Sequence, residues 1–303
     1  MEINREILSE IASVIGEGNI YENEPMAGRL TMKVGGPARY FFEPGDKAAL
    51  KGLIRILYEE NIPYYVLGNG SNVIVREEGF DGVIIHIGNG FSEITVSGKE
   101  IAAGAGSMLK DVSEAALAGS LSGFEFACGI PGSTGGGVSM NAGAYGGEMK
   151  DIVKDVRVIT EKGEEKILTN EEMAFGYRKS ACSDGVYIIT EAIFELKKGN
   201  PQEIKARMDD LTRQREEKQP LEYPSSGSTF KRPEGYFAGK LIMDSGLKGC
   251  CIGGAQVSEK HCGFVINKGN ATSEDVLELI EYIKKTVYEK QGVRLECEVK
   301  ILP

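Results

Sequence analysis

The sequence has no run of 18 or more consecutive apolar residues, which argues against a transmembrane helix. It has too little positive charge for a general nucleic-acid binder, because 35 lysines and arginines face 45 aspartates and glutamates, a formal net charge of −10. The start, MEINREILSEIASVIGEGN, lacks a basic segment and a small-residue cleavage site, so no signal peptide is predicted. We expect a cytoplasmic protein with no nucleic-acid partner and no membrane insertion.

The six cysteines contain no CxxC pair, and reduced thiols in a cytosolic protein are the simplest interpretation. A metal cluster could be imagined from Cys250, Cys251, His261 and Cys262. Vicinal cysteines rarely supply tetrahedral geometry, and no second ligand pair has finger-like spacing. We therefore expect no metal site.

Two nucleotide-binding motifs are also missing. No GxxxxGK[ST] segment exists, and the loops that begin at Gly68 and Gly104 lack the third glycine of GxGxxG. Yet the chain has 40 glycines, clustered between strand-like segments. The loops GNGSN (68–72) and GIPGSTGGG (129–137) could present main-chain N–H groups to a diphosphate. The alternative is that these glycines only shape turns.

Periodicity predicts three units, with boundaries at 1–85, 86–199 and 200–303. In the first we expect an amphipathic helix near the N-terminus, a strand–turn–strand over 30–44, a helix capped by Asp46, and strands at 64–67 and 82–87. In the second we expect short strands near residues 95 and 102, a helix over 108–118, and alternating strands over 153–160 and 186–196.

The third unit begins with a charged helix over 200–219 that has a thin apolar stripe. A loop, EYPSSGSTFKRPEG, and a short helix over 237–245 follow. The segment TSEDVLELIEYIKKTVYEKQG has a T-x-x-D start and a terminal glycine, which predicts a long helix over 272–292. The chain ends with a predicted strand, RLECEVKIL, over 294–302.

Six blocks occur in a characteristic order: LTMKVGGPARYF, VLGNGSNVIV, GIPGSTGGGVSMNAGAYGGEM, FGYRKSAC, SSGSTFKRP and LECEVKIL. Together they resemble the UDP-N-acetylenolpyruvoylglucosamine reductase (MurB) family, flavoproteins of peptidoglycan precursor synthesis. The resemblance covers the chain from about residue 25 onward. With no extra segment in the third unit, it resembles the shorter type of this family, which lacks an inserted tyrosine loop.

The resemblance implies an α+β fold: an FAD-binding fold of the vanillyl-alcohol-oxidase type, built from two α/β subdomains, plus a C-terminal α/β substrate-binding domain. It implies an oxidoreductase with noncovalent FAD and with NADPH as cosubstrate, in cell wall biogenesis and therefore cell shape and division. The substrate would be UDP-N-acetylglucosamine enolpyruvate and the product UDP-N-acetylmuramate. We expect a monomer.

By the same resemblance, a set of loop residues would contact the FAD: Val34, Gly35, Gly68, Asn69, Gly70, Ser71, Asn72, Pro131, Gly132, Ser133, Thr134, Gly135, Gly136, Asn141 and Ala142. Covalent flavin attachment would need His or Cys in the FAD subdomains, where His86, Cys128 and Cys182 are the candidates. His86 lies inside an apolar strand and is better explained as a core or edge residue.

The implied reaction adds hydride from reduced FAD N5 to C3 of the enolpyruvyl group, which leaves enolate character at C2. Arg178 matches the family residue that pairs with the substrate carboxylate, and Tyr177 would assist in positioning. Without the resemblance, Arg178 could form a surface salt bridge and Tyr177 could merely pack. Ser228 matches the proton donor to C2, although from the residues alone Ser225, Ser226 and Thr229 compete for that role.

Glu298 lies on the opposite face of the predicted last strand from Leu295, Cys297 and Val299. That pattern alone fits a solvated strand face; the resemblance makes Glu298 the acid partner of Arg178. Lys231, Lys240 and Gln256 are candidates for holding the uridine diphosphate. Two rival functions remain open: a flavin-dependent oxidase of the same fold, and a nonenzymatic UDP-sugar-binding protein.

Overall fold

The computed structural model describes residues 2–303 and divides the chain into two compact units. The first unit holds the residues up to Glu22 together with Tyr40–Asn69 and Gly82–Gln214. The second holds Asn23–Arg39, Gly70–Asp81 and Arg215–Pro303, so it is assembled from three separate stretches of chain. The three units expected from the sequence, with boundaries after residues 85 and 199, stay a prediction.

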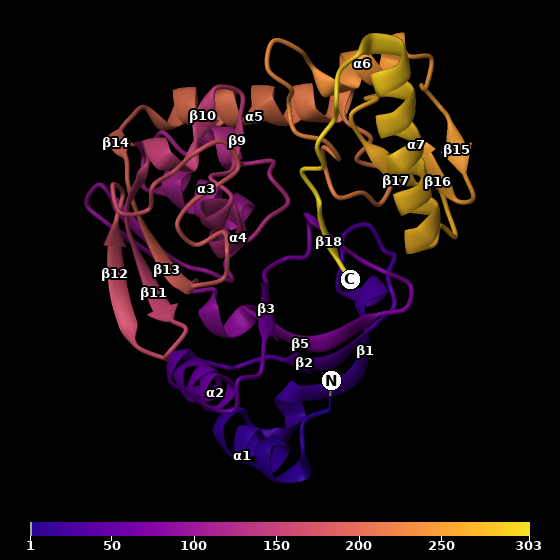
Figure 1. The fold of residues 1–303 in the computed structure, drawn as a ribbon. Coiled ribbons are helices and arrows are strands. Elements are labelled where there is room, and N and C mark those ends of the chain that lie inside the picture. Colours follow the sequence, from indigo (N-terminus) through magenta and orange to yellow (C-terminus); the bar gives the residue numbers. More distant parts are fainter. Residues whose placement is uncertain (1) are drawn as a thin grey trace. The chain divides into compact units, whose positions relative to one another are not determined.

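The elements follow one another along the chain as Figure 1 labels them. The α-helices are α1 (Arg5–Ile15), α2 (Lys47–Glu59), α3 (Leu109–Ala118), α4 (Thr134–Ser139), α5 (Pro201–Lys218), α6 (Ala238–Asp244) and α7 (Ser273–Gln291). The strands are β1 (Ile20–Pro25), β2 (Pro37–Phe42), β3 (Tyr64–Leu67), β4 (Val73–Val75), β5 (Phe80–His86), β6 (Ile94–Ser97), β7 (Glu100–Gly104), β8 (Leu121–Ser122), β9 (Gly143–Ala144), β10 (Gly147–Glu148), β11 (Val153–Thr160), β12 (Glu165–Thr169), β13 (Tyr187–Glu195), β14 (Lys197–Lys198), β15 (Cys251–Ile252), β16 (Ala255–Val257), β17 (Val265–Asn267) and β18 (Lys300–Leu302).

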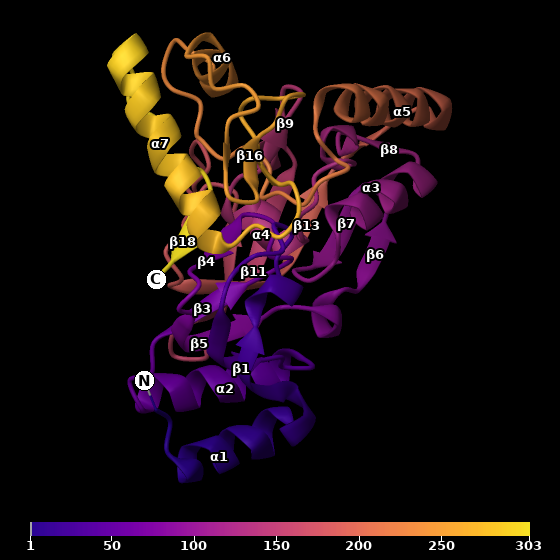
Figure 2. The ribbon, with the colours of Figure 1, turned by 90° about the vertical axis from the view of Figure 1, so that its right-hand side faces the viewer.

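In the first unit, helices α1 and α2 pack side by side (Figures 1 and 2). The side chain of Asp46 caps α2 by accepting a hydrogen bond from the Ala49 N–H at 2.8 Å, as the sequence predicts. One sheet of this unit has the order β1-β2-β5-β3. Within it β3 runs parallel to β5, with Leu67 opposite His86. The carboxyl end of β3 therefore leads directly into the glycine loop at residue 68.

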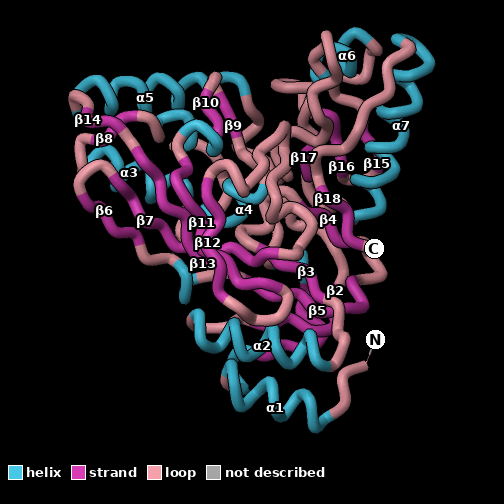
Figure 3. The backbone as a smooth tube through the Cα atoms, turned by 60° about the vertical axis from the view of Figure 1, so that its left-hand side comes forward, coloured by secondary structure: helices cyan, strands magenta, loops and turns pink. Residues whose placement is uncertain are grey.

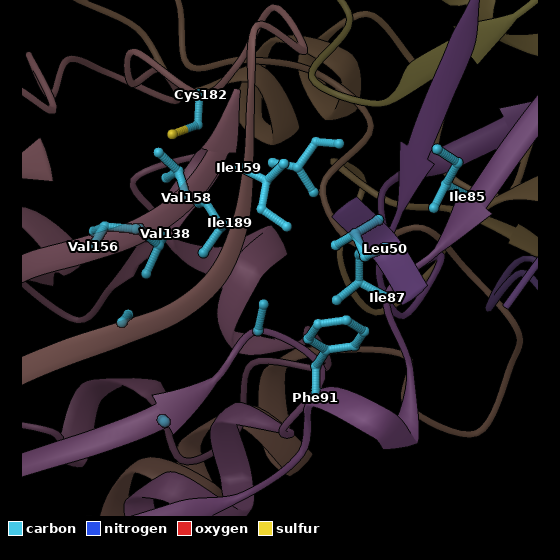
Figure 4. Close-up of a cluster of buried hydrophobic side chains, with 14 of the residues drawn as sticks. Leu50, Ile85, Ile87, Phe91, Val138, Val156, Val158, Ile159, Cys182 and Ile189 are labelled. Carbon is cyan, nitrogen blue, oxygen red and sulfur yellow. The ribbon is translucent and has the colours of Figure 1, made fainter. Parts of the chain in front are cut away.

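The other sheet of the first unit is antiparallel, with the order β12-β11-β13-β7-β6 (Figure 3). Helix α4 packs against β13 and β7. Figure 4 shows the core in this region, where Val138 of α4 lies among Val156, Val158 and Ile189 of the sheet. The alternation predicted for the two longest strands holds only in part. In β11 it is interrupted by register shifts at Val153/Asp155 and Arg157/Val158, and in β13 Ile188, Ile189 and Thr190 are buried in succession, so β13 is covered on both faces.

In the second unit, α7 packs against the small sheet β15-β16-β17 (Figure 1). The core contains Leu279, Ile280 and Ile283 of α7, which are fully buried. The same core takes in Met32, Val34 and Ile74 from the two stretches that lie far earlier in the sequence. Strand β4 pairs in parallel with β18, with Val73 opposite Lys300.

Two predicted strands are wrong. Residues 30–36 form turns and irregular structure, and only β2 of the expected strand–turn–strand is present. Of the predicted strand over 294–302, only β18 is a strand, so Glu298 precedes it. Buried and more exposed side chains alternate in both segments, for example in Met32, Lys33 and Val34. In the first segment, however, the backbone of Lys33 is left-handed with φ 59°, which interrupts the extended conformation that a strand needs.

Candidate active site

The loop after β3 lies against the loop before α4 within the first unit. The Asn69 side-chain amide donates to the Pro131 carbonyl at 2.7 Å. A Cβ at Gly68 would collide with the Ser133 hydroxyl, so only glycine allows this approach. The structure thus brings Gly68 and Asn69 of the first loop together with Pro131 and Ser133 of the second. This is the arrangement expected if both loops contact one ligand.

Ser133 has an unusual environment. Its side chain is 2 % exposed, and among residues 2–303 its hydroxyl has no hydrogen-bond partner. By contrast, the neighbouring N–H groups of Thr134 and Gly135 donate to the Ser107 and Ala105 carbonyls, both at 2.8 Å. A buried hydroxyl without a partner costs stability, which a bound polar group such as the diphosphate of FAD would relieve. The residues present therefore fit a bound cofactor here.

The glycines of α4 also have a packing role. A Cβ at Gly135 would lie 2.9 Å from the Ala105 Cβ, and one at Gly137 would lie 2.9 Å from the Leu109 Cδ1. Both distances are too short for ordinary contact, so larger residues would push α4 away from its neighbours. Close packing therefore accounts for Gly135 and Gly137, and the cofactor contacts expected in this segment stay a prediction.

Asn141 is a buried junction in the first unit, with φ 45° and 1 % exposure. Its amide donates to the Gly176 carbonyl and to the Glu148 carboxylate, each at 3.0 Å, and its carbonyl oxygen accepts from the Lys150 N–H at 2.9 Å. The neighbouring Ala142 donates its N–H to Gly137 at 2.7 Å. Asn141 therefore connects the segment after α4 to the turn that carries Arg178.

Arg178 occupies a tight reversal closed by hydrogen bonds between Gly176 and Lys179. It is left-handed with φ 54°, which costs energy for a residue with a side chain. The guanidinium lies 5.2 Å from the ring centroid of the exposed Tyr177 and donates to the Gly143 carbonyl at 3.4 Å. Tyr177 thus contributes a cation–π contact that orients Arg178.

Glu148 lies in the same neighbourhood, and the sequence contained no signal that singled it out. Hydrogen bonding from Lys150, supported by Asn141 and by the charge of Arg178, holds the pKa of the Glu148 carboxyl below its usual value. Glu148 is therefore an anion at neutral pH, and it favours the positive charge of the Arg178 guanidinium.

In the second unit, the remaining loop residues pack against β4 and its surroundings. Gly35 has φ 119°, and a Cβ there would lie 2.9 Å from the Val75 carbonyl oxygen, so glycine is required. The Val34 side chain is 2 % exposed and belongs to the core. The Gly70 carbonyl accepts from the Thr31 N–H at 3.2 Å, and Ser71 and Asn72 are half-buried.

Ser228 and Glu298 lie on adjoining segments of the second unit. The Glu298 N–H donates to the Thr229 carbonyl at 2.9 Å, and Phe230 pairs with Cys297 in an antiparallel bridge. Ser228 is exposed and Glu298 is half-buried, whereas the neighbouring Ser226 is 5 % exposed. The Ser226 hydroxyl has no partner within the described part of the chain. The structure therefore brings Ser228 and Glu298 together and keeps Ser226 buried.

The three candidates for the uridine diphosphate have protein partners. Lys231 pairs with Glu296 at 3.2 Å, and Lys240 pairs with Asp244 at 2.8 Å. The Gln256 amide donates to the Gly249 carbonyl and to Cys251 Sγ. Both ion pairs are at the surface, where such pairs are weak and exchange readily with a ligand. Their assignment stays a prediction.

The residues considered for covalent flavin attachment have protein contacts too. His86 Nδ1 lies 2.7 Å from Glu43 Oε1, which fits the edge-residue explanation. Burial raises the pKa of the Cys182 thiol to about 12, so this thiol is a poor nucleophile. Noncovalent binding remains the expectation.

Across residues 2–303, no three His, Cys, Asp or Glu side chains gather as ligands for a metal ion. None of the helices in that range is both long enough and apolar enough to cross a bilayer.

Comparison with known proteins decides the family. Residues 38–169 match the FAD binding domain model, and residues 219–302 match that of the UDP-N-acetylenolpyruvoylglucosamine reductase C-terminal domain. The reductase of this name from Clostridium perfringens strain SM101 is 53% identical over 286 residues, 94% of each chain. That from Geobacillus thermodenitrificans is 50% identical over 302 residues, 100% of this chain and 99% of the other.

The chain belongs to the UDP-N-acetylenolpyruvoylglucosamine reductase family. It is an FAD-dependent oxidoreductase, as the resemblance implied. The crystal structure of the family member from Thermus caldophilus (MurB) is 37% identical, with a TM-score of 0.82, and the match covers 94% of this chain and 100% of that one. The predicted fold class is confirmed.

A more distant solved structure, an alkyldihydroxyacetonephosphate synthase, aligns with a TM-score of 0.50 at 13% identity over 65% of this chain and 41% of that one. This likeness concerns the fold alone. The chain therefore shares its general architecture with a protein of another name, whereas the relatives of about 50% identity described above are named reductases.

Proposed function

We propose that this chain reduces UDP-N-acetylglucosamine enolpyruvate to UDP-N-acetylmuramate with NADPH, and that Ser228, Glu298 and Arg178 provide the proton and stabilise the developing charge. The observation that carries the reaction is identity of about half of all residues with named reductases over nearly the whole chain. The reaction places the protein in peptidoglycan precursor synthesis, and we propose that it acts in the cytoplasm as a monomer.

FAD, when bound, accepts hydride from NADPH and delivers it to the enolpyruvyl carbon C3. Saturating the double bond then requires a proton at C2, where enolate charge develops. Arg178 stabilises that charge by pairing with the substrate carboxylate, because a guanidinium can donate two parallel hydrogen bonds. Its left-handed backbone and its contact with Tyr177 hold the side chain in one orientation before the substrate arrives.

Ser228 provides the proton to C2. A serine hydroxyl is a weak acid, but an enolate is a strong base, so a well-placed neutral hydroxyl is sufficient. Support for Ser228 over its neighbours comes from exposure: Ser228 is exposed, whereas Ser226 and Thr229 are 5 % and 3 % exposed. The Thr229 hydroxyl is also occupied, because it accepts from the Val265 N–H at 3.1 Å. Glu298, on the adjoining segment, acts as the electrostatic partner.

The test separates the two half-reactions by anaerobic stopped-flow absorbance of the flavin. We expect NADPH to reduce the flavin and UDP-N-acetylglucosamine enolpyruvate to reoxidise it. Ser228→Ala should slow only the second step, by roughly 10²–10⁴-fold, as for loss of a general acid. Ser225→Ala is the matched control, because Ser225 is the half-buried competitor in the same loop; if Ser228 is the donor, this variant should leave the second step within about threefold of wild type.

Other outcomes identify the rivals. Rapid reoxidation by O₂ without the sugar nucleotide would favour an oxidase of the same fold. A colourless preparation, or a flavin that neither substrate alters, would favour a binding protein. Unchanged substrate-driven reoxidation in Ser228→Ala, with normal reduction by NADPH, would overturn the proton-donor assignment.

A further inference from the structure

Asn72 makes two hydrogen bonds to the segment that follows Glu298. Its side-chain amide donates to the Glu298 carbonyl at 3.1 Å, and its own carbonyl accepts from the Lys300 N–H at 3.0 Å. All of these residues belong to the second unit. Asn72 directly precedes β4, which pairs with β18 from Lys300 onward. The amide therefore extends the β4–β18 pairing by one bond, to the peptide of Glu298.

The opposite side of Glu298 is held as well. Its N–H donates to the Thr229 carbonyl at 2.9 Å, and Thr229 is fixed in turn by its N–H, which donates to the Gly263 carbonyl at 2.9 Å. The peptide groups on both sides of the Glu298 Cα are thus engaged, one with the segment that carries Ser228 and the other with Asn72. These two bonds hold the backbone at Glu298 on both sides and therefore set the direction of its Cα–Cβ bond, from which the carboxyl is carried.

We infer that Asn72 is a positioning residue for Glu298, and that it couples the loop at residues 70–72 to the proton-delivering segments. The inference rests on the proposed function, since it assigns Asn72 an effect on the substrate-driven step. A second link supports the coupling. The Gly70 carbonyl accepts from the Thr31 N–H, and the Thr31 hydroxyl donates to the Ser225 carbonyl at 2.7 Å. The same short loop therefore contacts both segments, one directly and one through Thr31.

The chemistry of the contact requires an amide. Aspartate has nearly the same shape, but its carboxylate has no hydrogen to donate and would place negative charge against the Glu298 carbonyl. Alanine removes the donor without adding charge. Both substitutions release the Glu298 peptide on one side, and a displacement of about 1 Å at a reacting group can reduce a rate by 10²-fold.

The experiment measures both half-reactions of the full-length holoenzyme carrying Asn72→Asp and, in parallel, Asn72→Ala. We expect the limiting rate of substrate-driven flavin reoxidation to fall by about 10–100-fold. Because Asn72 is also among the residues expected to contact FAD, the rate of reduction by NADPH is measured on the same samples, and the loss in reoxidation should exceed any loss in reduction by at least about tenfold. A loss shared equally by the two half-reactions, in either variant, would overturn the inference, because that pattern indicates general damage to the cofactor site or fold.

Two controls match the chemistry. Asn69, in the same loop, donates to the Pro131 carbonyl, so Asn69→Asp should weaken FAD retention and affect both half-reactions alike. Asn170, in the first unit, donates to the Lys150 and Val153 carbonyls at 2.9 and 2.6 Å. Asn170→Asp should lower thermal stability without separating the two half-reactions, and it therefore measures the cost of losing such a bond.

A double-mutant cycle with Glu298→Gln completes the test. If Asn72 acts through Glu298, adding Asn72→Asp to Glu298→Gln should change the reoxidation rate by less than about threefold. Full additivity would show that Asn72 acts independently and would overturn the inference. If Glu298→Gln and Ser228→Ala themselves leave reoxidation intact, the roles proposed for Ser228 and Glu298 fail; if they slow it and the Asn72 variants do not, only this inference fails.

Discussion

At Asn141 the sequence predicts one role, and the structure shows a second role that the sequence does not indicate. The resemblance predicts a cofactor contact, and the structure adds three hydrogen bonds to Gly176, Glu148 and Lys150 around the Arg178 turn. Its left-handed backbone suits asparagine or glycine. No local pattern reveals this role, because Gly176 lies 35 residues further along the chain.

We expect Asn141→Ala to lower the free energy of unfolding by about 2–4 kcal/mol, since it leaves buried polar groups unpaired and places a Cβ at positive φ. Asn141→Gly loses the same hydrogen bonds but tolerates the backbone, so it should cost about 1 kcal/mol less. Urea unfolding of the two variants measures the difference. Equal losses would show that the backbone conformation at this position carries no strain.

At the scale of the element, α7 is the best-predicted helix. Thr272 accepts from the Asp275 N–H at 3.1 Å, Asp275 accepts from the Thr272 N–H at 3.0 Å, and Gly292 ends the helix at φ 68°. The structure adds one bond that the pattern did not contain: the Gly254 N–H also donates to the Asp275 carboxylate at 3.0 Å. The cap thus ties α7 to the turn before β16.

The backbone N–H groups of Gly254 and then Thr272 hold the pKa of Asp275 below its usual value of 3.8. A lowered pKa stabilises the fold above the unfolded-state pKa, and this contribution is lost as the pH falls through the folded-state pKa. We expect Asp275→Ala to cost about 1–2 kcal/mol at pH 7, in the range of lost helix caps. The difference from wild type should shrink below pH 3.8, as followed by denaturant unfolding across pH.

Glu274 is the control for that measurement, because it lies in the same first turn and is exposed. Glu274→Ala should cost only a few tenths of a kcal/mol through the helix dipole. A pH-independent loss in Asp275→Ala would contradict the carboxylate cap.

The two misassigned strands show the limit of pattern at this scale. Met32 and Val34 are buried two residues apart, and Leu295 and Val299 are buried on either side of the half-buried Cys297, all with the spacing of one strand face. Period-two alternation reports which side chains are buried, whereas a strand also needs a neighbouring backbone to pair with. At 294–299 only isolated backbone contacts, such as those of Cys297 and Glu298, supply that partner.

At the scale of the whole molecule, the second unit is discontinuous. Met32, Val34 and Ile74 enter its core, β4 pairs with β18, and Glu77 accepts hydrogen bonds from the N–H and hydroxyl of Ser273 at 3.0 Å each. The composition shift near residue 200 contains no information about the two earlier stretches of this unit, whose last stretch begins at Arg215.

We therefore expect the isolated fragment 215–303 to lack a cooperative unfolding transition, because it is missing three core side chains and the partner of its last strand. Circular dichroism melting and amide proton dispersion would test this against the full-length chain. A sharp melt with well-dispersed resonances would show that the fragment folds alone and that the earlier stretches are peripheral.

The sequence by itself determined most helices, because a helix depends on the local spacing of apolar and capping residues. It also determined the family, the cofactor and the candidate residues, because six sequence blocks in a characteristic order carry the resemblance to the family. Tertiary structure decided which groups meet: Ser228 with Glu298 through Thr229, Glu298 with Asn72, and the turn of Arg178 with Asn141. Hydrogen bonds between residues 35 or 226 positions apart leave no periodic trace. Only folding, which brings distant backbone groups within 3 Å, reveals them.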